Sequence, residues 1–284
     1  MPKIANIQLN SQDNIDNNLI IIQKSIHAAK HGGADLAVLP ENACIMGPQG
    51  QLANRFHEMV DFYARLAHDT NMYILAGTLP CLTRPDGTPT DDRFRQSSLL
   101  FDNQGTLIAR YDKIHLFRAS VADGVGNYDE GRTFEAGDTP MVVSCVIAGV
   151  TIGVGMMICF DVRFSALCQK LRSMGADIIT VPSAFTHTTG KAHWQSLLTA
   201  RALDSQCLII GSAQGGRHHF THKNKQHTRQ TWGHGMMVDA NGQIISSTNK
   251  TDGGDFMITY ADFDKDEQDD VRKNMPIFKC QVDL

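Results

Sequence analysis

Residues 150–181 read VTIGVGMMICFDVRFSALCQKLRSMGADIITV, and this stretch decides the fold class. The apolar run at 150–158 predicts a buried strand, residues 164–173 predict a helix, and residues 178–181 predict a second strand. Strands that alternate with helices are typical of an α/β fold in which the helices cover the sheets. The alternation continues on both sides, with expected helices at about 17–31, 56–69 and 192–205 and expected strands at 35–40, 73–77 and 208–211.

Two segments outside this stretch resemble each other. Residues 99–108 (LLFDNQGTLI) and 236–245 (MMVDANGQII) each predict two strands joined by a turn that contains Asn and Gly. Their similarity suggests two related halves, each with a hairpin inside its own sheet. We therefore expect one domain, residues 1–284, that contains two sheets. The polar segments 83–95 and 217–230 are expected to be surface loops.

The composition excludes several classes of protein. Of the 284 residues, 42% are hydrophobic, which is enough for a substantial core and too many for a disordered chain. The 26 basic and 30 acidic residues give a formal charge of −4 without a basic block, so neither nucleic acid nor a membrane is an expected partner. No segment approaches the run of about 18 apolar residues that a membrane span needs. The first residues lack the features of a secretory signal, so a cytoplasmic protein is expected.

The cysteines and histidines give no pattern of a disulfide or metal framework. Seven cysteines are irregularly spaced without a CxxC pair, so most are expected to be inert buried thiols. His218, His219, His222 and His227 fall within one segment, but no carboxylate or cysteine stands among them. A metal site there stays open, whereas a solvated loop is the preferred interpretation. In a third interpretation, Arg217 of this loop borders a pocket and attracts an anionic substrate. We expect neither a metal nor a cofactor.

Three reactive side chains follow the ends of predicted strands. The strand at 35–40 leads to Glu41, the strand at 107–111 leads to Lys113, and the strand at 150–158 leads to Cys159. Ligands bind at the carboxyl ends of strands in α/β sheets. If these strands are neighbours, a carboxylate, an amine and a thiol converge at one site.

Such a convergence predicts nucleophilic catalysis. A free thiol has a pKa of about 8.5, and a helix N-terminus or a cation such as Lys113 lowers that value. Glu41 is placed to take the thiol proton as general base and return it to a leaving amine. Lys113 and the backbone N–H of Phe160 are the expected donors to an oxyanion. Taken singly, each residue also has a simpler interpretation: a capping carboxylate, a surface lysine or one more buried thiol.

At these residues the sequence resembles the nitrilase superfamily of carbon–nitrogen hydrolases. The segments 39–41 (LPE), 111–116 (YDKIHL) and 159–164 (CFDVRF) resemble the three motifs that carry the family's glutamate, lysine and cysteine. The resemblance covers nearly the whole chain, and the motifs occur in the family's order. It implies a four-layer αββα sandwich that pairs through helices into a homodimer. It also implies a supporting electrostatic role for Glu130.

Within the superfamily, the sequence is similar to the Nit-type amidases. Residues 182–194 (PSAFTHTTGKAHW) resemble a segment that these enzymes place beside the substrate. Within that segment, the implied substrate-binding residues are Phe185, Thr186, Thr189 and His193. Residues 213–219 (AQGGRHH) resemble the deaminated glutathione amidases, and residues 220–231 look like an insertion.

The resemblance implies an amidase that cleaves a small carboxylate-bearing amide, of the deaminated glutathione type, through a thioester acyl-enzyme. An ω-amidase or an N-carbamoyl amidase with the same three residues is an alternative. A third alternative is a binding or regulatory protein that kept the fold and lost the activity. The intact Glu41, Lys113 and Cys159 argue against this last interpretation.

Overall fold

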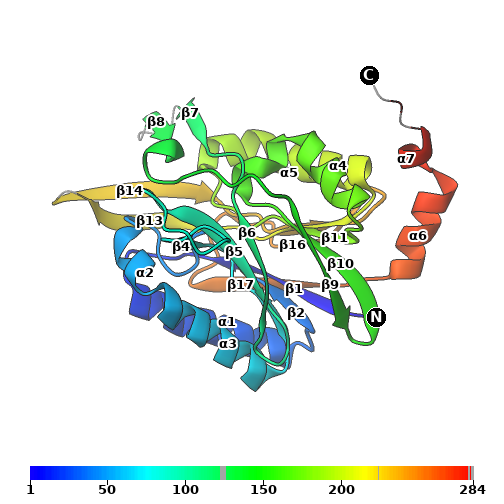
Figure 1. Ribbon diagram of the computed structural model, residues 1–284, viewed down its shortest axis with the longest axis horizontal. Coiled ribbons are helices and arrows are strands. Elements are labelled where there is room, and N and C mark those ends of the chain that lie inside the picture. The colour runs from blue at the N-terminus through cyan, green and yellow to red at the C-terminus, as the bar shows by residue number, and fades with distance from the viewer. Residues whose placement is uncertain (122–125, 223, 281, 283–284) are drawn as a thin grey trace.

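A mixed β-sheet forms one half of the molecule. The computed structural model describes residues 1–121, 126–222, 224–280 and 282 (Figure 1). The strands of this first sheet are β1 (Lys3–Leu9), β2 (Leu36–Val38), β3 (Tyr73–Leu75), β4 (Leu79–Cys81), β5 (Arg95–Phe101), β6 (Leu107–Asp112) and β17 (Phe256–Asp262). Their order is β17-β1-β2-β3-β5-β4, and β6 also pairs with β5. The central strands β1, β2 and β3 are parallel, while β17 and β5 run antiparallel to their neighbours.

A second sheet repeats this arrangement. Its strands are β9 (Met141–Ile147), β10 (Val150–Met156), β11 (Ile178–Thr180), β12 (Leu208–Gly211), β15 (Met236–Val238) and β16 (Ile244–Ser247). The order is β16-β15-β12-β11-β10-β9, with the parallel strands β10, β11 and β12 at the centre. Both predicted hairpins are present, β5 with β6 and β15 with β16. The expectation of two similar halves is therefore confirmed.

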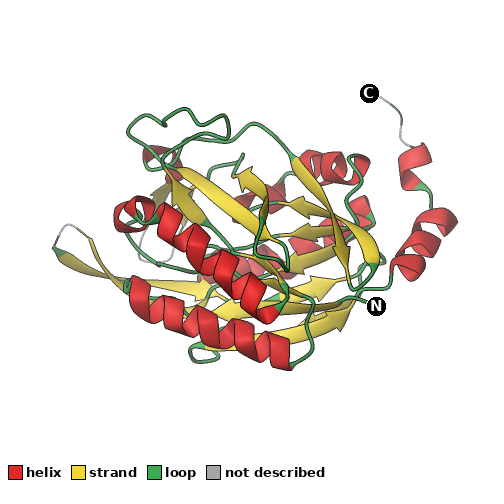
Figure 2. Cartoon of the chain, turned by 60° about the horizontal axis from the view of Figure 1, so that its bottom comes forward, coloured by secondary structure: helices red, strands yellow, loops and turns green. Residues whose placement is uncertain are grey.

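Helices cover the outer face of each sheet. The long helices are α1 (Ile15–His31), α3 (Phe56–Thr70), α4 (Ser165–Ser173) and α5 (His187–Ser205). Figure 2 shows α1 and α3 side by side over the first sheet, and their apolar side chains share a core with it. Helices α4 and α5 pack on the second sheet. The fold is the expected four-layer αββα sandwich.

The start of α5 differs from the expectation. The helix begins at His187 rather than near residue 192, because the Thr186 hydroxyl accepts a hydrogen bond from the Thr189 backbone N–H at 3.3 Å. A side chain that satisfies an unpaired N–H in this way fixes the first residue of a helix. The polar first turn of α5 follows this cap and carries Thr189, one of the residues that the sequence assigned to substrate binding.

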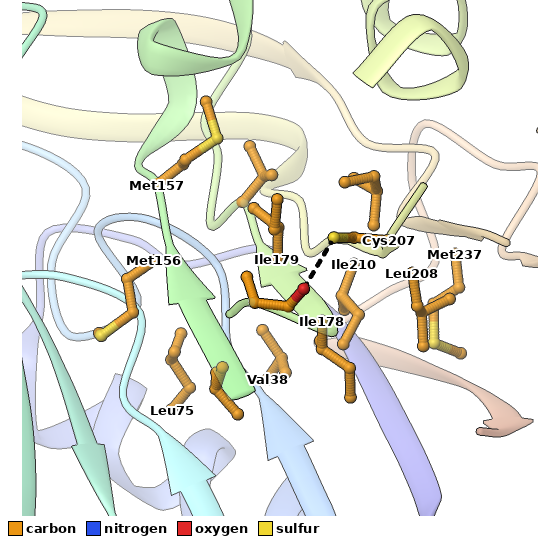
Figure 3. Close-up of a cluster of buried hydrophobic side chains, with 14 of the residues drawn as sticks. Val38, Leu75, Met156, Met157, Ile178, Ile179, Cys207, Leu208, Ile210 and Met237 are labelled. Carbon is orange, nitrogen blue, oxygen red and sulfur yellow. Dashed lines mark hydrogen bonds between the residues drawn. The ribbon is translucent and has the colours of Figure 1, made fainter. Parts of the chain in front are cut away.

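The inner faces of the two sheets bury a shared apolar core. Figure 3 shows Val38 and Leu75 of the first sheet beside Met156, Ile178 and Ile210 of the second. All five side chains are fully buried. Burial of each such side chain stabilises the fold by roughly 1.5–3 kcal/mol. The core therefore holds the two sheets in a fixed position relative to each other.

Residues 217–230 are not the solvated loop that the sequence predicted. They belong to a β-hairpin of β13 (Gly215–His222) and β14 (Lys225–Trp232), which pair with each other as a separate two-stranded sheet. The hairpin extends from the left side of the body in Figure 1. Because much of it faces solvent, its strands lack the apolar alternation by which strands are recognised.

The remaining helices and strands belong neither to the two large sheets nor to the four helices that cover them. They are α2 (Gly50–Asn54), β7 (Arg118–Val121), β8 (Gly126–Asp129), α6 (Lys265–Asn274), α7 (Ile277–Cys280) and the 3₁₀ helices η1 (Glu130–Arg132) and η2 (Cys159–Arg163). Among the helices of the described residues, none is long and apolar enough to cross a membrane.

Candidate active site

The structure brings Glu41, Lys113 and Cys159 together. Glu41 follows β2, Lys113 directly follows β6, and Cys159 begins η2 after β10. The first two residues come from one sheet and the third from the other, so the site lies where the carboxyl ends of strands from both sheets meet. Glu41 and Cys159 line one small pocket, and Lys113 is fully buried behind it.

Lys113 lies between two carboxylates. Its Nζ donates to Glu41 Oε1 at 2.9 Å and approaches Glu130 Oε2 at 2.8 Å. The Lys113 side chain is 0% exposed, so this ammonium depends on the two carboxylates for the interactions that water would otherwise supply. Although burial lowers the pKa of Lys113, the charges of Glu130 and Glu41 outweigh it and hold the pKa well above its usual range. The lysine is therefore a fixed positive charge with three donors, of which two are engaged.

Glu41 is held at both carboxylate oxygens. Oε1 accepts from Lys113, and Oε2 accepts from the backbone N–H of Ala184 at 2.9 Å. The Gln214 side chain also donates to the Glu41 backbone carbonyl at 3.1 Å. Since Ala184 and Gln214 follow strands of the second sheet, the carboxylate is fixed across the contact between the sheets.

Cys159 stands on a tight turn. Its φ of +49° lies in the left-handed region, which residues other than glycine seldom adopt. The Cys159 N–H donates to the carbonyl of Pro182 at 2.9 Å, which compensates part of the strain. Such strained positions are typical of functional sites, where the surrounding structure holds them. The turn gives Cys159 a place in the pocket wall although it is only 9% exposed.

The pKa of Cys159 differs from the expectation. We expected Lys113 and a helix N-terminus to lower it, but burial and the negative charges of Glu41 and Glu130 outweigh Lys113 and raise the pKa well above its usual range. The residue begins only a five-residue 3₁₀ helix, whose dipole is small. At rest the side chain is therefore a neutral thiol, which makes an adjacent base necessary for nucleophilic attack.

This raised pKa predicts that no thiolate forms at Cys159 near neutral pH. The ultraviolet absorbance of the wild-type protein minus that of Cys159→Ala should show no thiolate increment at neutral pH. The increment should appear only under strongly alkaline conditions, with circular dichroism as the check that the fold survives. A titration step below the ordinary cysteine range would contradict the prediction.

Asp161 connects the cysteine turn with the lysine segment, and sequence reasoning missed it. Its Oδ2 accepts from the Ile158 N–H at 2.9 Å and from the Tyr111 hydroxyl at 2.8 Å. Its Oδ1 accepts from the His115 N–H at 2.9 Å and lies 2.8 Å from His115 Nδ1. The carboxylate is 0% exposed. It therefore fixes the position of Cys159 relative to the segment that carries Lys113. Only its position within the CFDVRF motif gave a signal.

The pocket contains most of the expected substrate-binding residues. Its wall includes Phe185, Thr186 and Thr189 of that set, together with Glu130 and Phe160, which were expected to act as an electrostatic support and an oxyanion donor. The wall also contains residues that the sequence analysis did not name: Asn42, Phe117, Arg163, Ala184 and Arg229.

Two expected binding residues do not reach the pocket wall. His193 is exposed, and its Nδ1 lies 3.2 Å from Nη2 of Arg163. Arg163, and not His193, lines the pocket. Arg217 is exposed on β13, and the side chain of its buried neighbour His218 points to the opposite face. Successive side chains of a strand face opposite sides. The arginine at the pocket is Arg229, which pairs with His218 across the hairpin.

The histidines of the hairpin do not form a metal site. His218 is buried, with Nδ1 2.7 Å from the carbonyl of Ser11 and Nε2 2.6 Å from the Thr231 hydroxyl. Burial lowers its pKa to about 4, so it is a neutral structural residue at physiological pH. Within the described part of the chain, no group of three His, Cys, Asp or Glu side chains is arranged to hold a metal ion.

Comparisons with known proteins agree with this geometry. Residues 3–273 match the carbon–nitrogen hydrolase family. A deaminated glutathione amidase from Yersinia enterocolitica is 39% identical over 85% of this chain and 81% of its own length. The chain belongs to the carbon–nitrogen hydrolase family. A second relative of this carbon–nitrogen hydrolase, a deaminated glutathione amidase from Synechocystis sp., is 34% identical over 98% of this chain and 97% of its own length.

A solved structure confirms the fold of this carbon–nitrogen hydrolase. The NitFhit protein of C. elegans superposes with a TM-score of 0.79 and 28% sequence identity, over 99% of this chain. The match covers 65% of the NitFhit chain, so the present chain spans about two-thirds of that protein.

Proposed function

We propose that this carbon–nitrogen hydrolase is an amidase, formed by residues 1–284 as one domain, in which Cys159 attacks the amide carbon. One observation carries the proposal: a buried ammonium, Lys113, lies 2.9 Å from Glu41 and 2.8 Å from Glu130 at a pocket that contains a strained cysteine. An ion pair with a purely structural role would require neither the left-handed backbone at Cys159 nor the pocket that Glu41 and Cys159 line. Its family membership and its amidase relatives support the same chemistry.

Acylation follows from these positions. Glu41 takes the Cys159 proton as the sulfur attacks the carbonyl carbon, because the thiol is neutral at rest. The negative charge that develops on the carbonyl oxygen is met by the third donor of Lys113 and by the Phe160 backbone N–H. Glu41 then gives the proton to the leaving nitrogen, and the C–N bond breaks. Ammonia or an amine departs, and the acyl group stays on the sulfur as a thioester.

Deacylation uses the same residues, with water as the nucleophile and the Cys159 sulfur as the leaving group. A water molecule loses a proton to Glu41 and attacks the thioester carbon. The C–S bond breaks, the Cys159 sulfur takes the proton back from Glu41, and the carboxylic acid leaves. Glu130 maintains the charge and position of Lys113 through both steps, because Lys113 Nζ donates to Glu130 Oε1 at 3.0 Å while the Phe117 N–H holds Glu130 Oε2 at 2.7 Å.

For the substrate, we propose a small amide whose acyl half carries a carboxylate, of the type named by its deaminated glutathione amidase relatives. Arg163, four residues after Cys159, stands in the pocket wall, and burial lowers its pKa. No carboxylate of the described residues pairs with it, so a substrate carboxylate is a suitable partner. Phe185, Thr186 and Thr189 would complete the binding site.

A panel of small amides tests the activity. The wild-type protein should release ammonia or amine from carboxylate-bearing amides, and Cys159→Ala should not. Intact mass spectrometry during turnover should show an adduct with the mass of the acyl group on the wild type alone. Equal release by the two proteins, or no release by either, would contradict the proposal and favour a binding or regulatory role.

The expected homodimer and cytoplasmic location remain proposals that rest on the family resemblance and the composition. Light scattering after size-exclusion chromatography would measure the first, and cell fractionation would measure the second.

A further inference from the structure

A cleft lined mainly by positive charge lies away from the active site. It has a volume of about 380 Å³ and lies between the end of α4 and the last two helices, α6 and α7. Its wall contains one acidic residue, Asp269, and four basic residues: Arg172, Arg272, Lys273 and Lys279. None of these residues lines the pocket of Cys159. Figure 1 shows α6 and α7 on the side of the molecule opposite the β13–β14 hairpin, which carries a wall residue of that pocket.

Arg172, in the last turn of α4, has a donor that no described residue uses. Its Nε is buried and has no hydrogen-bond partner. Its guanidinium lies over the ring of Phe278, 5.3 Å from the centroid, a contact that supplies no acceptor oxygen. Burial and the positive charge of Arg272 lower the pKa of Arg172. Because buried polar groups in proteins are normally hydrogen-bonded, this side chain is suited to an acceptor from outside the chain.

Arg272, in contrast, is held by the protein itself. Its Nη1 donates to Asp177 Oδ1 at 2.8 Å and to Asp269 Oδ1 at 3.3 Å, and its Nε donates to the carbonyl of Gln206 at 3.0 Å. Asp177 also pairs with Lys265 at 2.7 Å. The two carboxylates beside the cleft are therefore already paired, and they do not neutralise the other cations of its wall.

Arg172, Lys273 and Lys279 have no carboxylate partner among the described residues. The ion pairs of this part of the chain include none of the three. Like charges in one cleft repel each other, and an anion between them would remove this repulsion. Arginine binds phosphate through paired N–H donors, and lysine binds it as a point charge. A phosphate group offers more charge and more acceptor oxygens than a carboxylate, so it fits three cations better.

We propose that this cleft is a second ligand site, which binds a phosphate group either as free phosphate or on a small phosphorylated metabolite. Arg172 would donate to the phosphate oxygens, and Lys273 and Lys279 would supply further positive charge. The cleft is larger than a phosphate group and has room for the body of a metabolite. The site is separate from the catalytic pocket, so this inference does not depend on the proposed amide chemistry.

Titration calorimetry at low ionic strength tests the chemical class of the ligand. The ligands are inorganic phosphate, glucose 6-phosphate, glucose, and glucuronate, whose sixth carbon is a carboxylate. The wild type should bind both phosphates, should bind glucuronate at least about tenfold more weakly than glucose 6-phosphate, and should not bind glucose. Tighter binding of glucose 6-phosphate than of inorganic phosphate would identify a phosphorylated metabolite as the source, and equal binding would identify free phosphate. Binding of glucuronate as tight as that of glucose 6-phosphate would overturn the phosphate assignment.

Single variants locate the binding site. Arg172→Gln should weaken phosphate binding by about ten- to a hundredfold, the range expected of a charged hydrogen bond. Lys273→Gln and Lys279→Gln should each weaken it by about two- to fivefold, because exposed ammonium groups stay hydrated. Lys170→Gln removes a charge from an exposed position of the same helix as Arg172, outside the cleft, and should leave the affinity unchanged.

A double variant separates recognition from a structural effect, because Arg172→Gln also removes the contact with Phe278. Lys273→Gln combined with Lys279→Gln keeps that contact and should weaken phosphate binding by about four- to twenty-five-fold, the product of the single effects. Unchanged affinity in this double variant would overturn the inference, even if Arg172→Gln fails to fold. A loss of binding in Arg163→Gln with none in Arg172→Gln would place the anion in the catalytic pocket and overturn it too. So would a wild type that binds neither phosphate.

Discussion

Glu41→Gln is expected to lower kcat by about 10²–10⁴-fold, the usual contribution of a positioned general base. The loss should lie near the upper end of this range, because Glu41 moves a proton in both acylation and deacylation. The resting Cys159 side chain is a neutral thiol whose pKa is raised by burial, so it depends on this base. Steady-state release of ammonia or amine measures the effect.

The glutamine variant also has a structural cost that must be measured. Both Glu41 oxygens accept hydrogen bonds, one from Lys113 and one from the Ala184 N–H. Glutamine has one acceptor oxygen, so one of these donors loses its partner, at a cost of about 1–3 kcal/mol. Glu130→Gln removes a carboxylate from the same lysine and serves as the matched control. A smaller loss of kcat for Glu41→Gln than for Glu130→Gln would contradict the assignment of the base.

Lys113→Met is expected to destabilise the fold by about 3–5 kcal/mol, the cost of removing one partner from a buried ion pair. The Lys113 side chain is fully buried, and its removal leaves Glu41 and Glu130 without their shared ammonium. Denaturant unfolding measures this change. The variant also lacks an oxyanion donor and should lose about 10²–10³-fold in kcat.

The pH dependence distinguishes the electrostatic cause from a simple packing defect. In the wild type the pKa of folded Lys113 is raised above its unfolded value. Its stabilising contribution is therefore fully present below the unfolded pKa and is lost as the pH rises through the folded pKa. The destabilisation of Lys113→Met relative to the wild type should therefore stay constant through neutral pH and shrink only under strongly alkaline conditions, where the folded wild-type lysine loses its proton. The double variant with Glu130→Gln should recover part of the stability. A destabilisation that does not shrink as the pH rises above the ordinary lysine pKa would contradict the ion-pair explanation.

The central part of the site was predictable from the sequence because strand ends determine it. Glu41, Lys113 and Cys159 each follow an apolar run, and the carboxyl ends of parallel strands meet at one edge. The α/β fold and its two hairpins were predictable for a related reason, since periodicity and turn residues are local signals. The confirmed family resemblance added the four-layer arrangement, which periodicity alone does not specify.

Other features of the site depend on contacts between distant segments. Asp161 connects residues that lie 46 and 50 positions away, and no local pattern indicates such a contact. The pKa of Cys159 was predicted in the wrong direction, because burial and two carboxylates outweigh the lysine. Arg217 was named and Arg229 was not, because the segment was interpreted as a loop. Successive side chains of a strand face opposite sides, but a loop has no such alternation. The loop interpretation therefore gave no means of telling which arginine faces the pocket.

The site is divided between the two sheets, and this has a consequence for how activity arises during folding. Glu41 and Lys113 follow strands of the first sheet, while Cys159 and the Ala184 N–H that fixes Glu41 belong to the second. Neither sheet with its helices holds a working set of groups, so a partly folded chain is inert until the sheets have docked. Turnover during refolding would thus record the last step of assembly, and would lag behind signals of secondary structure.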